Sequence, residues 1–223
     1  MPEWWSYTLS DFLLFSPRTY YRMIERHNEA LWPAHLATIG LGLAAVVMLR
    51  RPAAARGRAT LAVLAVLWAW VGWSFVWRRY ASINWAASYL VWLFVVEALV
   101  LLWLGVLRQR LAFGWRSGAG GLLGAALFLT ALLAYPLIAP LTGRGWQQSE
   151  VFGVAPDPTA AATLGLVLLL EGPFRWALML PPALWCLVAG LTLYAMGSAE
   201  AWVPLVAVIL ALAGLRARAM AAT

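Results

Sequence analysis

Long apolar runs recur along almost the whole chain, and short polar or glycine- and proline-containing segments separate each run from the next. A helix needs about 20 mostly apolar residues to cross the roughly 30 Å hydrocarbon core of a bilayer. Because lipid offers no hydrogen bonds, the backbone of such a chain must satisfy itself within helices. We therefore expect an all-α fold, a polytopic transmembrane helix bundle of about seven spans. The predicted spans are Leu31–Leu49, Thr60–Trp77, Ala86–Leu107, Ala119–Ile138, Thr159–Leu170, Phe174–Met196 and Ala201–Leu215.

The composition agrees with a chain whose solvent is lipid. Hydrophobic residues make up 64% of its 223 residues and charged residues only 11%, whereas soluble domains are about half apolar and a quarter charged. We expect one transmembrane domain over residues 1–223, with an interfacial segment at 1–30, a helix bundle at 31–215 and a cytoplasmic tail at 216–223. The fifth and seventh predicted spans are short, so tilt, extension into the flanks and a partly re-entrant path all stay open for them.

The residues ahead of the first span predict a helix that lies along the membrane surface. Ser16 and Pro17 form an N-cap followed by proline at the first helical position. The stretch from there to Glu29 mixes apolar residues with arginines and glutamates, which is typical of a helix in the headgroup layer. Pro33 marks the expected bend into the first span.

The residue types that are missing or rare exclude several functions. All 16 basic residues are arginine, so the chain cannot form a retinal Schiff base or a lysine-containing phosphate-binding loop. Cys186 is the only cysteine, and His27 and His35 are the only histidines. We therefore expect no intrachain disulfide, no metal site and no cofactor. Arginines that flank spans explain the net charge of +7, so we expect no nucleic-acid partner, and no motif indicates an enzyme.

The distribution of the arginines predicts the orientation. If the loops after the first, third, fifth and seventh predicted spans are cytoplasmic, ten arginines lie inside and six outside. The positive-inside rule favours that arrangement. We expect the N-terminus outside and the C-terminus in the cytoplasm.

Glu97 lies near the middle of the third predicted span, and its helical neighbours are all apolar. A carboxyl inside a membrane costs several kcal/mol and normally faces the bundle interior. One interpretation is a site for a proton, a cation or a substrate. The other is a structural carboxyl bonded to another helix, for example through Thr130 in the fourth span.

The segment 140–158 is the most polar stretch between predicted spans. A functional loop would dip into the bundle mouth, whereas a structural loop would stay ordered on the surface. Asp157, followed by Pro158 and Thr159, is placed to cap the fifth span. The polar residues that the loop would present to a solute are Arg144, Gln147, Gln148 and Glu150.

Arg78, Arg79 and Asn84 lie between the second and third predicted spans, on the expected outer side. Two arginines there run against the charge rule, so we expect them to be paired with Glu150, Asp157 or acids of the N-terminal segment. Together with Arg144 and Glu150 they would form a vestibule for a small anion or polar molecule. Contact with phospholipid headgroups is the alternative.

Gly120 and Gly124 form a small-xxx-small face at the start of the fourth predicted span. Such a face lets another helix approach closely. The partner is either a helix of the same bundle or a second copy of the chain.

Three segments carry a resemblance that covers nearly the whole chain: the opening from Trp4 to Tyr21, the stretch Arg79–Ala86, and Glu150–Thr159. The stretch Trp185–Gly190 adds to them. The sequence resembles an uncharacterised family of bacterial multi-span proteins. This resemblance implies a bacterial inner-membrane protein, and it transfers neither an activity nor catalytic residues.

Three hypotheses for function follow from these features. The leading one is a small-solute or ion permease, or a channel-like protein, with an outer vestibule and Glu97 at mid-depth. The alternative is a non-transporting membrane subunit or scaffold of a larger complex, suggested by the small size, the Gly120/Gly124 face and the 15 tryptophans. A membrane enzyme that acts on a lipid headgroup is the third. The lipid bilayer is the expected partner, with a second copy or a membrane complex as further candidates.

Overall fold

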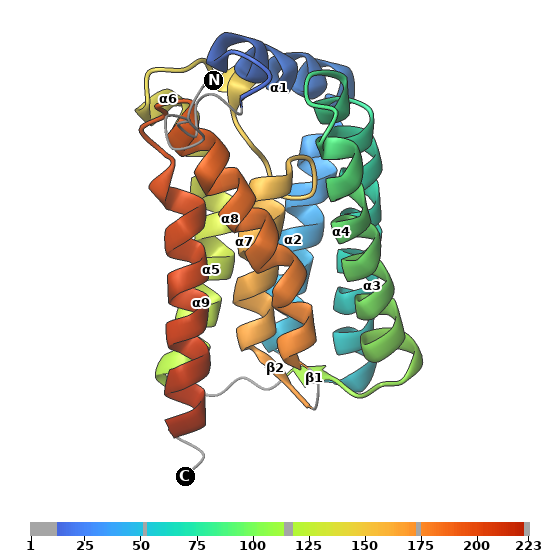
Figure 1. Cartoon of the computed structure of the whole chain (residues 1–223). Coiled ribbons are helices and arrows are strands. Elements are labelled where there is room, and N and C mark those ends of the chain that lie inside the picture. Colours follow the sequence, from blue (N-terminus) through green and yellow to red (C-terminus); the bar gives the residue numbers. More distant parts are fainter. Residues whose placement is uncertain (1–12, 51–52, 114–117, 173–174, 221–223) are drawn as a thin grey trace, which may run out of the picture.

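The computed structural model describes residues 13–50, 53–113, 118–172 and 175–220 as a bundle of roughly aligned helices with one helix across its end (Figure 1). Residues 1–12 of the predicted interfacial segment and 221–223 of the predicted tail lie outside the described residues. The crossing helix is α1 (Pro17–Leu31), and we call its end of the bundle the α1 end. The short strands β1 (Ala112–Phe113) and β2 (Leu170–Glu171) mark the opposite end, which we call the strand end.

Helix α1 begins where the sequence predicts. The Ser16 hydroxyl accepts a hydrogen bond from the Thr19 backbone N–H at 3.2 Å, and Pro17 is the first helical residue. The axis turns by 85° between α1 and α2 (Ala34–Arg50), and Pro33 lies at this bend. The buried side chains of α1 share one face at helical spacing, and they are Tyr20, Met23, Ile24 and His27.

Five helices within the described residues are long and apolar enough to cross a membrane. The predicted first span is the 17-residue helix α2, which reaches span length only together with α1 across the 85° bend. The predicted fifth span is α7 (Pro156–Leu168), which has 13 residues. The structure therefore gives five helices that could span a membrane, or six if the bent pair of α1 and α2 is one span, and it does not confirm the expected seven. The five are Ala54–Ser82, Ala87–Leu107, Ala119–Leu141, Arg175–Ala195 and Trp202–Met220.

Several of these long helices change their hydrogen-bonding pattern along their length. Helices α3 (Ala54–Val71) and α4 (Ala87–Val100) continue as the π-helical segments Gly72–Trp77 and Leu101–Leu107. Helix α5 (Ala119–Leu129) passes through a π-helical segment, Thr130–Ala134, and a 3₁₀ turn before it ends as α6 (Ile138–Leu141). Helices α8 (Leu180–Ala195) and α9 (Trp202–Met220) complete the bundle.

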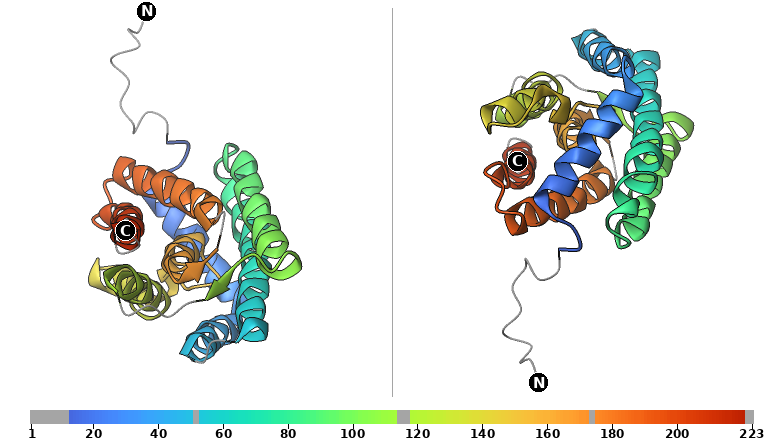
Figure 2. Two further views of the ribbon diagram at one scale, coloured as in Figure 1. Left: turned by 90° about the horizontal axis from the view of Figure 1, so that it is seen from below. Right: turned by 90° about the horizontal axis from the view of Figure 1, so that it is seen from above.

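Helix α7 is the centre of the fold. It packs against α5, α8, α9 and α3, and Figure 2 shows it surrounded by the other helices. Every residue from Val151 to Leu170 is buried. Irregular backbone at membrane depth is tolerated only where protein surrounds it or a cavity lies beside it. The turn-containing segment Val151–Ala155 that leads into α7 meets this condition because all of its residues are buried.

An arginine side chain binds backbone carbonyl groups at the C-terminus of α7 and in β2, at the strand end. The Arg218 guanidinium donates to the carbonyl oxygens of Leu168 and Leu170, the second at 2.9 Å. Strand β2 then pairs antiparallel with β1, with Ala112 opposite Glu171. Cations near a helix C-terminus also complement its dipole. The C-terminal carbonyl groups of this short helix thus have hydrogen-bond partners, although the helix does not cross the full bundle.

The glycine face of the fourth predicted span packs inside the bundle. A Cβ on Gly124 would lie 2.8 Å from the Gly165 carbonyl oxygen of α7, and one on Gly120 would lie 2.7 Å from the Gly214 carbonyl oxygen of α9. These distances allow backbone to approach backbone, which larger side chains would prevent. The interpretation of internal packing is confirmed, and this face is not open to a second copy.

Candidate functional site

The loop between α6 and α7 enters the bundle from the α1 end. Its first part is exposed at the surface, where Trp146 and Gln147 lie, but Val151–Ala155 are buried. Helix α1 fixes the descent, because the Asn28 side-chain amide donates to the carbonyl oxygens of Gln147 and Ser149 at 2.8 Å each. The sequence left open whether this loop dips into the bundle or stays on the surface. Its first part lies on the surface, and its second part, Val151–Ala155, lies inside the bundle.

Two further contacts anchor the buried part of this loop. The His27 ring Nε2 lies 3.2 Å from the Val154 carbonyl oxygen. Gly153 adopts φ +72°, which favours glycine, and its N–H donates to the Thr159 hydroxyl at 2.9 Å. These contacts position the start of α7 well below the bundle surface.

Asp157 lies in the first turn of α7 and is only 1% exposed. The Trp185 indole N–H donates to its Oδ1 at 2.7 Å. Its Oδ2 is buried without a hydrogen-bond partner among the described residues. Such an oxygen leaves a place for a proton, a water molecule or a cation.

Glu200, in the turn between α8 and α9, joins the same region. Its carboxylate lies 2.7 Å from Arg144 Nη2, and it accepts a hydrogen bond from the Tyr21 hydroxyl at 2.8 Å. The Arg144 guanidinium lies 4.2 Å from the centre of the Tyr21 ring. Glu200 could not be predicted as a site residue from the sequence, because an acid in a short turn is not unusual. Only the fold brings it close to Arg144.

We define the carboxyl cluster as Glu150, Asp157 and Glu200 together with Arg144. Burial, then the negative charge of Asp157, raises the pKa of Glu150 well above its usual range, while Arg144 acts in the opposite direction. Burial raises the pKa of Asp157 to about 6, although the Trp185 hydrogen bond lowers it. Full ionisation would place three negative charges, those of buried Asp157 and Glu200 and of half-buried Glu150, beside one positive charge. The raised pKa values of Glu150 and Asp157 therefore favour protonation at a pH where isolated carboxyls are ionised.

Glu97 lies elsewhere, sealed in the contact of α4 with its neighbours. It is 0% exposed, and neither carboxyl oxygen has a hydrogen-bond partner among the described residues. The predicted hydrogen bond to Thr130 is wrong, because Thr130 is exposed in a groove between α5 and α9. None of the four cavities described for the molecule is lined by Glu97.

A row of aromatic rings lies beside both buried acids. Trp185, which binds Asp157, packs edge-on against Phe94 at 4.9 Å between ring centres. Phe94 in turn lies 4.7 Å from Trp68, whose indole N–H donates to the Thr163 hydroxyl of α7 at 2.8 Å. Phe94 precedes Glu97 by three residues in α4, so the two side chains lie on neighbouring turns of the same helix.

The predicted vestibule is divided in two. Arg144, Glu150 and Asp157 come together, but the expected ion pairs of Arg78 and Arg79 with Glu150 or Asp157 are absent among the described residues, so that pairing is wrong. Helix α1 lies between the two groups. The Arg78 guanidinium instead stacks on Trp73 at 5.2 Å. The Asn84 amide donates to the Tyr80 hydroxyl at 3.3 Å, and the Gln148 amide to Glu25 at 3.4 Å.

A groove of about 390 Å³ leads from the side of the bundle toward the carboxyl cluster. It opens between α5–α6 and α9, which pack closely at the strand end through Gly120 and Gly214. Its lining is mostly apolar, and Ala161 of α7 belongs to it. Thr142 and Glu200 supply polar groups near its α1 end. The groove gives Glu200 an approach from outside the bundle.

Comparison with known proteins returns one family. Neither a curated protein nor a solved structure matches the chain. The sequence model of a family of unknown function, DUF6064, matches residues 18–223. This match supports the resemblance to an uncharacterised family, and it brings no activity with it. The chain belongs to the DUF6064 family.

Proposed function

We propose that this protein is a small-solute or ion permease, or a channel-like protein, in which the carboxyl cluster binds a proton or small cation. One observation carries the proposal. Asp157 is 1% exposed with an unpartnered Oδ2, at the head of a half-length helix and beside two further acids. Ionisable groups within a membrane bundle are costly, and they usually mark ion or proton pathways.

The chemistry of the cluster favours exchange of a proton for a cation. A cation that approaches Asp157 stabilises its carboxylate and releases the proton, because the site lacks enough positive charge for all three acids. Discontinuous helices supply such sites in transporters, since their ends place backbone and side-chain ligands at mid-depth. Helix α7, preceded by the buried segment Val151–Ala155, has this form.

We further propose that the α1 end faces the outside of a bacterial inner membrane. The loops at the strand end carry most of the arginines, which the positive-inside rule places in the cytoplasm. Helix α9 ends at the strand end, opposite α1 (Figure 1). A solute would then reach the cluster from outside, through the groove or beside α1.

A flux measurement with purified protein in liposomes tests this function. A potassium or sodium gradient is imposed, and a trapped pH-sensitive dye reports proton movement. We expect Asp157→Asn to lower ion-driven proton flux by about tenfold or more, since it removes an exchangeable proton from the site. Glu97→Gln is the matched control, because it removes another fully buried carboxyl.

The outcomes separate the two candidate sites. Flux that falls with Asp157→Asn and stays with Glu97→Gln supports the carboxyl cluster. The opposite pattern would move the ion site to Glu97. Equal flux in wild type, Asp157→Asn and empty liposomes would rule out ion transport by this site.

A scaffold or non-transporting subunit is the alternative function. Its support from Gly120 and Gly124 is gone, because both pack within the bundle. Exposed tryptophans on the π-helical segment Gly72–Trp77 and on α4, among them Trp77 and Trp92, still offer a surface to a membrane partner. Purification in mild detergent decides: a partner that co-purifies in fixed ratio supports this alternative, and a lone chain with measurable flux excludes it.

A further inference from the structure

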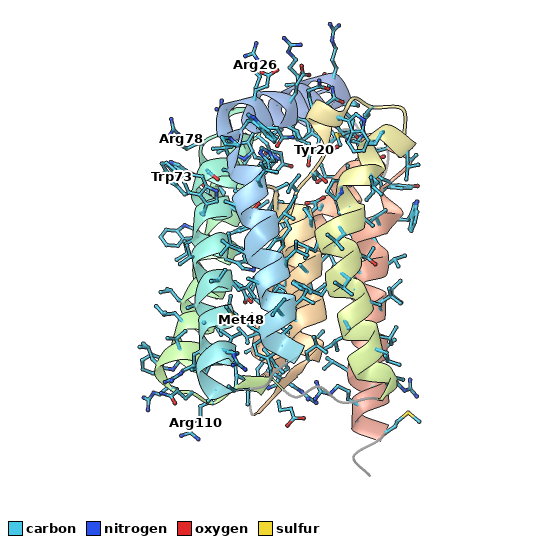
Figure 3. The ribbon with its side chains drawn as sticks, turned by 180° about the vertical axis from the view of Figure 1, so that it is seen from behind. Tyr20, Arg26, Met48, Trp73, Arg78 and Arg110 are labelled. Atoms are coloured by element: carbon cyan, nitrogen blue, oxygen red, sulfur yellow. The ribbon has the colours of Figure 1, made fainter. Side chains whose placement is uncertain are left out.

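A second charged region lies on the other flank of α1, in a depression of about 620 Å³ between α1 and the turn that joins α3 to α4. We call it the arginine depression. Figure 3 shows Arg26 pointing away from the bundle while Tyr20 of the same helix points into it. The polar residues that line the depression are Arg18, Thr19, Arg22, Arg26, Arg79 and Ser82.

The described residues leave most of this positive charge without an ion pair. Arg18, Arg22 and Arg26 are spaced four residues apart, so their side chains neighbour one another along α1 and repel. Arg18 also lies in the first turn, where the helix dipole is positive and no acid compensates it. Within the described residues these four arginines make one ion pair, Arg22 with Glu25 at 3.8 Å.

Arg79 adds positive charge on the side of the depression opposite α1. It comes from the far end of the α3 helix, after the π-helical segment Gly72–Trp77, and it faces the arginines of α1 across the depression. Its neighbour Arg78 does not line the depression and stacks on Trp73 instead. The fold therefore separates two adjacent arginines and places only one of them opposite α1.

We propose that the arginine depression binds a phosphate group. Guanidinium groups match phosphate oxygens in pairs of parallel hydrogen bonds, and several of them together favour a compact anion with more than one negative charge. A bound phosphate relieves the repulsion along α1 and complements the dipole at its start. The phosphate belongs either to an anionic phospholipid or to a soluble phosphate compound, since α1 lies at the bundle end where both are accessible.

This inference stands apart from the proposed function. The carboxyl cluster contacts α1 through Tyr21, and the depression uses none of the cluster's residues. Loss of ion flux leaves phosphate binding intact, and loss of phosphate binding leaves the cluster intact.

Binding is measured on the purified protein with two probes at low salt. Native mass spectrometry counts bound phosphatidylglycerol against phosphatidylcholine, and calorimetry in detergent follows inorganic phosphate. We expect the double variant Arg22→Gln/Arg79→Gln to bind whichever probe the wild type prefers about tenfold more weakly. Arg78→Gln, the matched control from the adjacent position, should stay within about twofold of the wild type, since its charge is exposed and outside the site.

Each outcome of these binding measurements either supports or overturns the proposal. Binding of the lipid alone assigns the site to a headgroup, and binding of inorganic phosphate assigns it to a soluble compound. Failure of both probes on the wild type overturns the proposal, and so does an equal loss in Arg78→Gln, which would indicate only general surface charge. Because the double variant relieves repulsion between arginines and loses only the exposed ion pair of Arg22 with Glu25, it should unfold at about the wild-type temperature or above, and that measurement excludes misfolding as the cause of lost binding.

Discussion

Asp157 and Glu97 are equally hidden from solvent, at 1% and 0% exposed, yet their surroundings differ in every other respect. Asp157 begins a helix, accepts a hydrogen bond from Trp185 and has two other acids and an arginine within electrostatic reach. Glu97 lies in mid-helix, and neither of its oxygens has a partner among the described residues.

Burial alone therefore does not make an ion site. Exchange of a proton needs groups that compensate the charge in each state, and the carboxyl cluster supplies them through Arg144, Trp185 and the neighbouring acids. Among the described residues, no hydrogen-bond donor or acceptor reaches either carboxyl oxygen of Glu97. Asp157 should therefore respond to charge and pH changes to which Glu97 does not.

Loss of Arg144 should have the largest effect. Its side chain and that of Glu200 are 14% and 8% exposed, so Arg144→Gln leaves a buried carboxylate without its partner. We expect a loss of about 3–5 kcal/mol in unfolding free energy, measured by denaturant titration in detergent at neutral pH.

The double variant Arg144→Gln/Glu200→Gln is the control for this prediction. It removes both charges, and it should recover most of the lost stability. A double variant as unstable as Arg144→Gln would show that lost packing on Tyr21, and not the unpaired charge, causes the loss.

Acidification from pH 7.5 to 5 should stabilise the protein through Asp157 by about 1.4 kcal/mol, roughly half of the maximum that its pKa change supports at 1.36 kcal/mol per pKa unit. Its pKa rises from 3.8 to about 6 on folding. A group with a raised folded pKa contributes stability that is full below the unfolded pKa and is lost as the pH rises through the folded one. The gain on going from pH 7.5 to 5 should therefore be present in the wild type and reduced in Asp157→Asn.

His27 acts in the opposite direction and sets the lower limit of this window. Burial lowers its pKa from 6.5 to about 4, so its contribution to stability is lost as the pH falls from 6.5 toward 4. Comparison of Asp157→Asn with the wild type at each pH cancels the His27 contribution. If the two curves run parallel between pH 7.5 and 5, Asp157 is not the group that titrates.

The elements of the fold that depend on local pattern could be predicted from the sequence. The five long helices overlap predicted spans, and Ser16 and Pro17 start α1 as expected, because apolar runs and caps act over neighbouring residues. The shortness of α7 was visible, but its central place was not, since it depends on the contact between Gly124 and Gly165.

The site was only partly predictable, for a related reason. Arg144, Glu150 and Asp157 belong to one polar loop and could be grouped by proximity along the chain. Glu200 joins them only because the turn between α8 and α9 reaches Arg144. The sequence could not show that α1 would lie between Arg79 and Arg144, because the resting place of an amphipathic helix depends on the surface beneath it.

Removal of the Glu97 carboxyl should stabilise the protein. Both of its oxygens are buried without a partner among the described residues, and such a group costs about 1–3 kcal/mol. We expect Glu97→Leu to raise the unfolding free energy by an amount in that range, whereas Asp157→Leu lowers it because Trp185 loses its acceptor. A destabilised Glu97→Leu would indicate that Glu97 has compensating contacts, and it would then resemble Asp157.

The smallest expected effect is the coupling between the two carboxyls. Changes at sites that share no partner usually add to within about 0.5 kcal/mol. Phe94 and Trp185 lie beside the two acids, and Asp157 and Glu97 share no hydrogen bond. The double-mutant cycle of Asp157→Asn with Glu97→Gln should therefore close within that error in unfolding free energy, whereas the cycle of Arg144→Gln with Glu200→Gln should not. Coupling between Asp157 and Glu97 as large as that of the ion pair would mean that a proton or a water chain connects them, and the two carboxyls would then be parts of one pathway.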